Sequence, residues 1–412
     1  MNITHGFSLY VDAFHNCAEK FAEQTAVFDE KSSITYAELD KASDITALEL
    51  IVKGVKKGDR VILYVPRTKE AIVAALAIWK AGGVYVPVDD SYPEERINYM
   101  ISDSAAVCIC TVHSLWDTKP LDMPLENLIF LDEVKNSDRD YRIVTLPECL
   151  PEDDALVIYT SGSTGKPKGA LHTHLSLFSL ANWQPDSEKP LSASSHFVNL
   201  TSFSFIACIT DLFSPLLCGG STFIVTNETK KDLKQLYNSF CRNGITNVHA
   251  PVRLAVLLLE NYDMRPFEVR MGGERVTHFN PMYQTTITQQ YGSSEGCFTV
   301  TGAIKGNEDP MPLGKANKCI EYMILDDELK PVGQGEVGEF TYCGPILAKG
   351  YLNKPELTAE KWFERDGKRW YRTGDLVRED ENGLLYYVER KDFMVKINGF
   401  RVELQLLVLE AM

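Results

Sequence analysis

Short apolar runs alternate with helix-like stretches along the first half of the chain, and this alternation constrains the fold more than any other feature. The helix-like stretches include residues 14–21 and 36–52. The strand-like runs lie at residues 60–65, 84–88, 105–111, 155–159 and 221–225. Parallel strands need crossover helices, which cover both faces of their sheet. The pattern therefore predicts an α/β fold with two helix-flanked, mostly parallel sheets.

The pattern changes after about residue 296, where strand-rich segments such as 339–343 and 383–388 are bounded by Gly, Pro and Asp. A chain of 412 residues exceeds what one hydrophobic core usually supports. We expect a large core over residues 1–391, with a smaller β-barrel-like subdomain at roughly 297–391. A charged cluster at 390–392 predicts a hinge, and residues 392–412 would begin a small C-terminal α+β domain.

Composition narrows the possible partners and compartment. The chain has 42 basic and 57 acidic residues, and its net charge of -15 repels phosphate backbones and anionic lipids. We therefore expect no nucleic-acid or membrane partner. The ten cysteines form no CxxC pair, and we interpret them as buried apolar residues in a reducing cytoplasm. Because neither a signal sequence nor an apolar run of ~18 residues is present, we expect a cytoplasmic protein. We also expect a monomeric domain.

A loop at residues 159–169, reading YTSGSTGKPKG, follows an apolar strand and has the composition of a phosphate-binding loop. Its glycines let backbone N–H groups face an anion, its hydroxyls add donors, and a lysine adds charge. The candidate ligands are Thr160, Ser161, Gly162, Ser163, Thr164, Gly165 and Lys168. A Walker loop is excluded because Pro167 follows Lys166 where Ser or Thr is required. A flexible surface loop is the alternative.

This loop resembles the phosphate loop of the adenylate-forming superfamily, which includes acyl-CoA synthetases, luciferases and nonribosomal peptide synthetase adenylation domains. Further segments resemble that family's motifs in order: residues 34–39 (ITYAEL), 79–88 (WKAGGVYVPV), 272–274 (GGE), 291–295 (YGSSE), 338–352 (GEFTYCGPILAKGYL), 371–376 (YRTGDL) and 390–403 (RKDFMVKINGFRVE). The resemblance covers essentially the whole chain. The wording of residues 79–88 and 395–403 is most similar to that of peptide synthetase adenylation domains.

The resemblance implies roles for residues far from the loop. Asp375 would accept both ribose hydroxyls with Arg390 nearby, Tyr291 would stack on adenine, and Glu295 would hold Mg²⁺. The rest of the implied nucleotide site is Gly273, Glu274, Gln289, Gly292, Ser293 and Ser294. Thr160, Lys168 and Glu295 would be the catalytic residues.

The implied reaction joins a carboxylic acid to ATP as an acyl-adenylate and releases pyrophosphate. The acyl group would then pass to a phosphopantetheine thiol, on a carrier protein or on coenzyme A. Asp392 matches the family's hinge position. The family's small domain carries a lysine that clamps carboxylate and phosphate, and no residue here matches it, so we expect nucleotide binding with poor adenylation.

Residues 203–213 (FSFIACITDLF) resemble the motif in which peptide synthetases place an Asp after a Phe, to pair with the substrate's α-ammonium. Ile206 occupies that position, and Phe205 matches the aromatic gate of the thiol tunnel. Because a buried ammonium without a carboxylate is costly, an α-amino acid is disfavoured, and a hydroxy, keto, aryl or other acid is expected. Asp211 is the alternative ammonium partner.

The other positions that match the family's acid pocket are Ala207, Thr210, His249, Arg270, Gly272, Gln290 and Phe298. Arg270 is suited to bidentate capture of a second carboxylate, although a structural ion pair would explain it equally well. The leading hypothesis is an adenylation domain that loads a carrier protein. The alternatives are a free-standing acyl- or aryl-CoA ligase and, from another class, a catalytically impaired nucleotide-binding scaffold.

Overall fold

Residues 8–134, 144–160, 166–183, 190–391, 394–397 and 400–403 are described by a computed structural model of the chain, the last two ranges as backbone only. Their contacts divide the chain into two units. Unit 1 comprises Met1–Tyr159, Leu171–Trp183 and Leu191–Ile245. Unit 2 comprises Thr160–Ala170, Gln184–Pro190 and Thr246–Met412.

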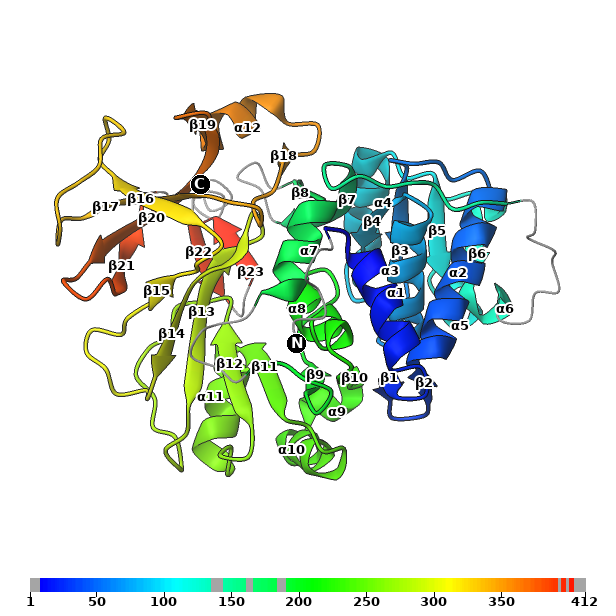
Figure 1. Cartoon of the computed structure of the whole chain (residues 1–412), viewed down its shortest axis with the longest axis horizontal. Coiled ribbons are helices and arrows are strands. Elements are labelled where there is room, and N and C mark those ends of the chain that lie inside the picture. The colour runs from blue at the N-terminus through cyan, green and yellow to red at the C-terminus, as the bar shows by residue number, and fades with distance from the viewer. Residues whose placement is uncertain are drawn as a thin grey trace. The chain divides into compact units, whose positions relative to one another are not determined.

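Unit 1 contains a parallel sheet in the order β7-β4-β3-β5-β6 (Figure 1). Its strands are β3 (Arg60–Leu63), β4 (Val84–Pro87), β5 (Cys108–Thr111), β6 (Leu128–Phe130) and β7 (Asp154–Thr160). Every residue of β4 and β5 is buried. Strands covered on both faces read as continuous apolar runs, which is why the sequence pattern located them.

A second sheet of unit 1 places β9 (His196–Asn199), β10 (Ser221–Ile224) and β1 (Thr25–Asp29) in parallel, with β2 (Ser33–Thr35) antiparallel at the edge. The guanidinium of Arg67 donates hydrogen bonds to the carbonyls of Asn199, at the end of β9, and of Thr201, each at 2.7 Å. Burial lowers the pKa of this guanidinium to about 10. Arg67 thus anchors the loop that leads into residues 203–213.

The helices of unit 1 are α1 (Tyr10–Lys20), α2 (Tyr36–Val52), α3 (Glu70–Lys80), α4 (Glu94–Ser104), α5 (His113–Trp116), α6 (Leu131–Val134), α7 (His174–Asn182), α8 (Cys208–Phe213), α9 (Asn227–Lys231) and α10 (Leu233–Arg242), with 3₁₀ turns at Leu125–Asn127 and Pro215–Leu217. A capping box starts α2, in which Thr35 and Glu38 each accept the other's backbone N–H. In Figure 1, α1, α2 and α3 lie side by side and contact one another.

One sheet of unit 2 carries most of the predicted site. Strands β11 (Asn247–Pro251), β12 (Glu268–Gly272) and β13 (Ile287–Ser293) are parallel, and β14 (Cys297–Ile304) and β15 (Lys315–Ala316) continue the sheet antiparallel. The helix α11 (Val252–Asn261) connects β11 to β12. The β13–β14 hairpin carries the YGSSE motif at its tip.

The second sheet of unit 2 is antiparallel, in the order β16-β17-β20-β19 with β21 also paired to β20. Its strands are β16 (Glu321–Leu325), β17 (Gly338–Cys343), β19 (Trp362–Arg365), β20 (Lys368–Glu379) and β21 (Leu385–Arg390). The remaining elements are β8 (Lys168–Thr173), β18 (Gly350–Tyr351), α12 (Pro355–Lys361), β22 (Met394–Ile397) and β23 (Phe400–Glu403). This path of strands is open, so within the described ranges the expected barrel-like subdomain is a twisted sheet without closure.

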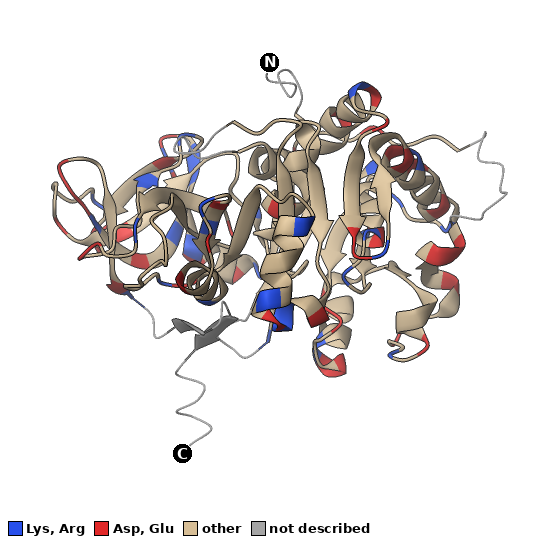
Figure 2. Ribbon diagram, turned by 90° about the horizontal axis from the view of Figure 1, so that it is seen from below, with Lys and Arg blue, Asp and Glu red and all other residues tan. Residues whose placement is uncertain are grey.

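The α/β prediction is confirmed, and each predicted helix and strand is present with ends shifted by a few residues. The prediction that residues 1–391 and 392–412 form separate domains stays a prediction. Cys108 and Cys110 are free and buried, as expected, whereas Cys241 is exposed. Figure 2 shows acidic and basic residues interspersed along helices and loops. In the described part of the chain, no helix has the length and apolar character needed to cross a membrane.

Candidate functional site

The two ends of the predicted phosphate loop lie on strands. Thr160 ends β7 and Lys168 begins β8. The hydroxyl oxygen of Thr160 is buried without a hydrogen-bond partner within the described ranges. A buried polar atom in that state needs a ligand or water to satisfy it. The loop residues Ser161, Gly162, Ser163, Thr164 and Gly165 lie outside the described residues, so their role stays a prediction.

Lys168, Glu295 and Tyr351 form a cluster at the start of β8. Lys168 Nζ donates to Tyr351 Oη at 3.0 Å, and Tyr351 Oη donates to Glu295 Oε1 at 2.6 Å. The ammonium and that carboxylate oxygen are 4.0 Å apart, and the Glu295 side chain is wholly buried. The predicted phosphate lysine and the predicted Mg²⁺ ligand are therefore neighbours.

Backbone contacts fix the position of Glu295, which follows β13 in the hairpin turn. Its carbonyl accepts a hydrogen bond from Ala348 N at 2.7 Å. The next residue must be glycine, because a Cβ on Gly296 would lie 2.2 Å from Tyr342 Oη. A larger residue would displace either the turn or the ring, and the carboxylate with it.

Asp375, Tyr291 and Arg390 form a second cluster. Tyr291 Oη donates to Asp375 Oδ2 at 2.5 Å, and Arg390 Nη1 donates to Asp375 Oδ1 at 2.8 Å. The strand pairing sets this geometry, since Asp375 on β20 is directly opposite Arg390 on β21. Burial, the negative charge of Asp375 and the hydrogen bond to it raise the pKa of Tyr291 well above its ordinary value. Its hydroxyl therefore remains protonated at neutral pH and can donate the hydrogen bond to Asp375.

The two clusters meet on one hairpin. Tyr291 and Glu295 are four residues apart in sequence, and each contacts a different member of the predicted ATP site. Tyr291 reaches the predicted ribose carboxylate Asp375, whereas Glu295 lies beside the predicted phosphate lysine Lys168. The tip of the β13–β14 hairpin thus connects the two predicted ends of one nucleotide site within unit 2.

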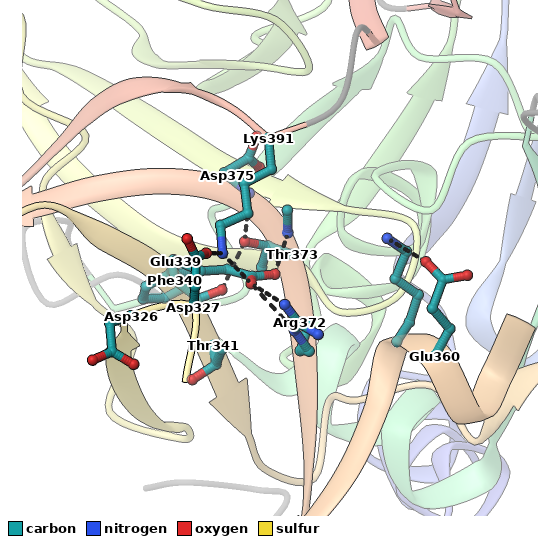
Figure 3. A network of polar contacts seen from close by, with 12 residues as sticks. Asp326, Asp327, Glu339, Phe340, Thr341, Glu360, Arg372, Thr373, Asp375 and Lys391 are labelled. Atoms are coloured by element: carbon teal, nitrogen blue, oxygen red, sulfur yellow. Dashed lines mark hydrogen bonds and ion pairs between the residues drawn. The ribbon is translucent and has the colours of Figure 1, made fainter. Parts of the chain in front are cut away.

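Glu339 contacts the irregular stretch of β20 that presents Asp375 (Figure 3). Its Oε1 accepts from Gly374 N at 3.0 Å, and its Oε2 accepts from Arg372 Nη2 at 2.7 Å. Lys391 Nζ lies 3.2 Å from the same Oε2 and 2.7 Å from Asp327 Oδ1. Burial alone would raise the pKa of Glu339, but Arg372, the Gly374 N–H and Lys391 together hold it below the ordinary value.

The predicted adenine-facing residues are Gln289 within β13 and Gly273 and Glu274 directly after β12. Gln289 is buried, and its Oε1 atom has no hydrogen-bond partner in the described part of the chain. Gly273 has a φ of +93°, a conformation that favours glycine. Glu274 accepts a hydrogen bond from Arg253 N at 3.3 Å. The unsatisfied amide oxygen of Gln289 is suited to accept from an exocyclic amine such as that of adenine.

The YGSSE turn is shaped by its own small residues. A Cβ on Gly292 would lie 1.2 Å from the carbonyl oxygen of Cys297, so this position requires glycine. Ser293 Oγ accepts from Glu295 N at 3.4 Å, and Ser294 is half-buried. Their predicted contacts with nucleotide stay predictions.

Five of the predicted pocket residues belong to unit 2, namely His249, Arg270, Gly272, Gln290 and Phe298. His249 and Arg270 are paired on neighbouring strands and are each 2% exposed. The rings of His249 and Phe298 meet edge to face at 5.1 Å. Gln290 is buried, and neither its amide oxygen nor its nitrogen has a partner within the described ranges. This group of buried polar side chains could recognise a polar ligand.

The other four predicted pocket residues, Phe205, Ile206, Ala207 and Thr210, belong to unit 1. They lie at the start of α8, where Thr210 Oγ1 donates to Ala207 O at 2.9 Å. Ile206 is 7% exposed. The alternative ammonium partner, Asp211, is fully buried and accepts a hydrogen bond from Thr201 Oγ1 at 2.7 Å.

The sequence motifs did not identify Tyr351 or Glu339 as site residues. Both lie in residues 338–352, a segment whose resemblance to the family assigns no role to single side chains. A glutamate inside the apolar strand Gly338–Cys343 was the available signal for Glu339. The predicted hinge residue Asp392 lies outside the described residues.

The donor set suits Mg²⁺ bound with a nucleotide. Within the described ranges, no group of three or more His, Cys, Asp and Glu residues could hold a metal ion by itself. Mg²⁺ at ATP sites takes only one or two protein carboxylates, with phosphate oxygens and water completing its shell. The buried carboxylate of Glu295 beside Lys168 could supply such a ligand.

Comparison with known proteins identifies a family. Residues 14–352 match the AMP-binding enzyme family. Tyrocidine synthase 3 of Brevibacillus parabrevis is 34% identical over 415 residues, covering 95% of this chain and 6% of that protein. Bacitracin synthase 1 of Bacillus licheniformis is 33% identical over 397 residues, covering 95% of this chain and 7% of that protein.

A fungal protein, malpibaldin synthetase of Mortierella alpina, is 33% identical over 419 residues, covering 95% of this chain and 7% of that protein. The chain therefore corresponds to a small part of each of these synthetases.

Solved structures show the same fold. NpsA-ThdA from Klebsiella oxytoca, an artificially fused Adenylation-PCP di-domain NRPS, superposes with a TM-score of 0.85 at 24% identity, covering 97% of this chain and 82% of that chain. The Klebsiella oxytoca NpsA N-terminal subdomain, in complex with 3-hydroxyanthranilyl-AMSN, gives a TM-score of 0.81 at 24% identity. That match covers 93% of this chain and 100% of the subdomain.

Proposed function

The chain belongs to the AMP-binding enzyme family, and on that basis we propose that it activates a carboxylic acid with ATP as an acyl-adenylate. The supporting observation is the hairpin that carries both Tyr291 and Glu295. One of these residues contacts Asp375 and the other lies beside Lys168. The two predicted ends of an ATP site are thereby joined inside one unit.

In this proposal Lys168 and the hydroxyl of Thr160 face the phosphates, and Asp375 accepts the ribose hydroxyls. Each Asp375 oxygen already accepts one protein hydrogen bond, and a carboxylate oxygen has a second lone pair for a ribose hydroxyl. Gln289 would accept from the adenine amine. Bound Mg²⁺ would neutralise charge on the phosphates, with Glu295 as its protein ligand.

The chemical step is an in-line displacement. A carboxylate oxygen of the acid attacks the α-phosphorus, and the bond from that phosphorus to the bridging oxygen breaks. Pyrophosphate leaves with the bridging oxygen and its electron pair, so the products are acyl-AMP and pyrophosphate. Lys168 offsets the negative charge that develops on the phosphoryl oxygens.

The acid would not be an ordinary α-amino acid. Ile206 is an apolar, nearly buried side chain where related adenylation domains place an Asp. A substrate ammonium beside it would lose its hydration without gaining a carboxylate partner. Hydroxy, keto and aryl acids avoid that cost, and Arg270 would favour an acid that carries a further acceptor group.

The acyl group would pass to the phosphopantetheine thiol of a carrier protein. The thiol sulfur attacks the acyl carbon, AMP leaves with its oxygen, and the thiol proton is released. The relatives at 33% to 34% identity are named as synthases or synthetases, and the solved structure NpsA-ThdA is an adenylation-PCP di-domain NRPS by its title, which supports a carrier protein as acceptor. The alternative is a free-standing acyl- or aryl-CoA ligase, which uses the same first step. It differs from a carrier-loading adenylation domain in its thiol acceptor, which is coenzyme A.

The test measures ligand binding and pyrophosphate exchange on the same protein. Isothermal titration calorimetry with ATP and Mg²⁺, followed by a panel of acyl-sulfamoyladenosines, reports nucleotide and acid recognition. Pyrophosphate exchange with amino, hydroxy, keto and aryl acids reports turnover. We expect ATP binding and a preference for acids without an α-ammonium. An intact fold that binds no ATP would contradict the proposal. ATP binding without binding of any acyl-sulfamoyladenosine would favour the scaffold alternative.

A further inference from the structure

Tyr351 lies between the two charged residues that the proposed function assigns to phosphate and metal. A phenol has one donor hydrogen and can also accept a hydrogen bond. Tyr351 uses both capacities, because its Oη accepts from Lys168 at 3.0 Å and donates to Glu295 at 2.6 Å. The ring itself is also in contact with the ammonium, which lies 4.3 Å from the ring centroid.

The backbone around Tyr351 is tied to both of its polar partners. On one side, Leu352 N donates to Gly169 O at 2.8 Å, beside Lys168 on β8. On the other side, Ala348 N donates to Glu295 O at 2.7 Å. The segment from Ala348 to Leu352 therefore sets the distance between the strand that carries the lysine and the turn that carries the glutamate.

Both the backbone and the ring of Tyr351 have contacts besides those with Lys168 and Glu295. The backbone N–H donates to Thr358 Oγ1 at 3.0 Å, and the ring packs edge to face on Trp362 at 5.0 Å. Gly350 has a φ of +151°, and a Cβ there would lie 2.7 Å from Thr358 Cγ2. These contacts position the backbone and the ring independently of Lys168 and Glu295.

The hydroxyl of Tyr351 keeps the ammonium of Lys168 and the carboxylate of Glu295 from pairing closely. Lys168 Nζ and Glu295 Oε1 are 4.0 Å apart, at the limit of a direct ion pair. Without the intervening hydroxyl, a flexible lysine would close onto the wholly buried carboxylate, because a buried charge gains most from a charged partner. Each group would then be neutralised by the other instead of by a ligand.

We propose that Tyr351 is a positioning residue that keeps Lys168 and Glu295 as separate charges, one for the nucleotide phosphates and one for Mg²⁺. This role rests on the proposed function, since it assumes that ATP and Mg²⁺ bind here. It predicts that the tyrosine hydroxyl controls nucleotide affinity even when no metal is present. A residue that only stabilises the fold would not have that effect.

The experiment uses Tyr351→Phe, which keeps the ring contact with Trp362 and removes the hydroxyl. Calorimetry would measure ATP affinity in EDTA and then at increasing Mg²⁺ concentrations. We expect the dissociation constant for metal-free ATP to rise about tenfold, because Lys168 pairs with Glu295. In a second measurement, Mg²⁺ is titrated while the increase in melting temperature caused by ATP is followed. We expect the Mg²⁺ concentration that gives half of the maximal increase to rise about tenfold.

Tyr322→Phe is the matched control. Tyr322 on β16 also donates its hydroxyl to a glutamate, Glu379, at 2.7 Å, but it belongs to neither cluster of the candidate site. We expect both ATP measurements to match the unsubstituted protein. The double variant Tyr351→Phe with Glu295→Gln should recover metal-free ATP affinity, because a neutral amide cannot form the ion pair, while its response to Mg²⁺ stays weak.

Two outcomes would overturn the positioning role, and only one of them also overturns the proposed function. If the unsubstituted protein binds ATP and Tyr351→Phe binds it equally well in EDTA and in Mg²⁺, the positioning role is wrong and the proposed function stands. If the unsubstituted protein is folded but binds no ATP, the proposed function is wrong and the positioning role is lost with it.

Discussion

Tyr291 donates a hydrogen bond to Asp375 at 2.5 Å, although 84 residues separate them in the chain. The contact joins the tip of the β13–β14 hairpin to the antiparallel sheet that presents Asp375. Arg390 holds the other oxygen of the same carboxylate at 2.8 Å. The orientation of Asp375 is therefore set by two partners from different elements, before any ribose hydroxyl binds. This preorganisation is the basis of the first prediction.

Asp375→Asn should weaken ATP binding about tenfold or more. The substitution keeps the shape of the side chain but removes the charge that would strengthen two ribose hydrogen bonds. It also removes the ion pair between Asp375 and Arg390, so the melting temperature should fall. Calorimetric titration with ATP and a thermal melt measure the two effects.

Asp327→Asn is the control for charge removal, because Asp327 pairs with Lys391 but its side chain is 93% exposed. We expect no measurable change in ATP affinity for this variant. Equal ATP affinity of the Asp375 variant and the unsubstituted protein would contradict the assignment of Asp375 to the ribose.

Glu339→Gln should destabilise unit 2 by about 2–3 kcal/mol, because Arg372 and Lys391 lose their shared anionic partner in a partly buried setting. The irregular stretch of β20 at Gly374 should loosen because it loses its contact with a carboxylate, so ATP affinity should fall together with stability. Urea denaturation of the variant measures the free energy of unfolding. The matched control is Glu321→Gln, which breaks an exposed pair with Lys368 and should change stability far less.

Glu339 also predicts a dependence on acid. Its pKa is held below the ordinary value, so its ionised form stabilises the fold at every pH above about 4.5. That contribution is lost as the pH falls through the lowered pKa. The Glu339→Gln variant should therefore lose less stability between pH 5 and pH 3 than the unsubstituted protein. An equal loss of unfolding free energy between pH 5 and pH 3 in the variant and in the unsubstituted protein would contradict this account.

His174 should make unit 1 less stable as the pH falls below about 6.5. Burial lowers its pKa to about 4, and both of its ring nitrogens lack partners in the described part of the chain. Between those pH values the unfolded chain binds a proton that the folded chain does not, so stability should fall by about 1 kcal/mol at pH 5.5.

The variant for this test is His174→Leu, which removes the titrating group from the buried position. Urea denaturation at pH 7.5 and pH 5.5 should then show a pH difference that is smaller by about 1 kcal/mol. An unchanged difference in the His174 variant would show that other groups cause the acid sensitivity.

Ile206→Asp should shift acid recognition toward α-amino acids. The new carboxylate would give a substrate ammonium a partner, at the cost of placing a charge at a position that is 7% exposed. We expect a lower melting temperature and at least tenfold tighter binding of an aminoacyl-sulfamoyladenosine relative to its hydroxyacyl counterpart. Ile206→Asn introduces polarity without charge and should show no such preference. A preference for aminoacyl probes in the unsubstituted protein would contradict the role of Ile206.

Strong local patterns carried most of the fold prediction. The buried strands Val84–Pro87 and Cys108–Thr111 are continuous apolar runs that alternate with helix-like stretches. The ends of the elements moved by a few residues because hydrogen bonding, and not polarity, ends a strand or helix. Closure of the β-rich region into a barrel depends on pairing between distant strands, which local patterns do not report.

The sequence by itself determined the α/β class, the order of the strands along the chain and the motif residues Lys168, Glu295 and Asp375. Only the tertiary structure decided that Tyr351 lies between Lys168 and Glu295, which are 183 and 56 residues away from it. Periodicity and capping act over a few residues, whereas such contacts depend on strand register and on turns that bring remote segments together. For the same reason Glu339, an acidic residue in an apolar strand, became a site residue only once β17 was paired with β20.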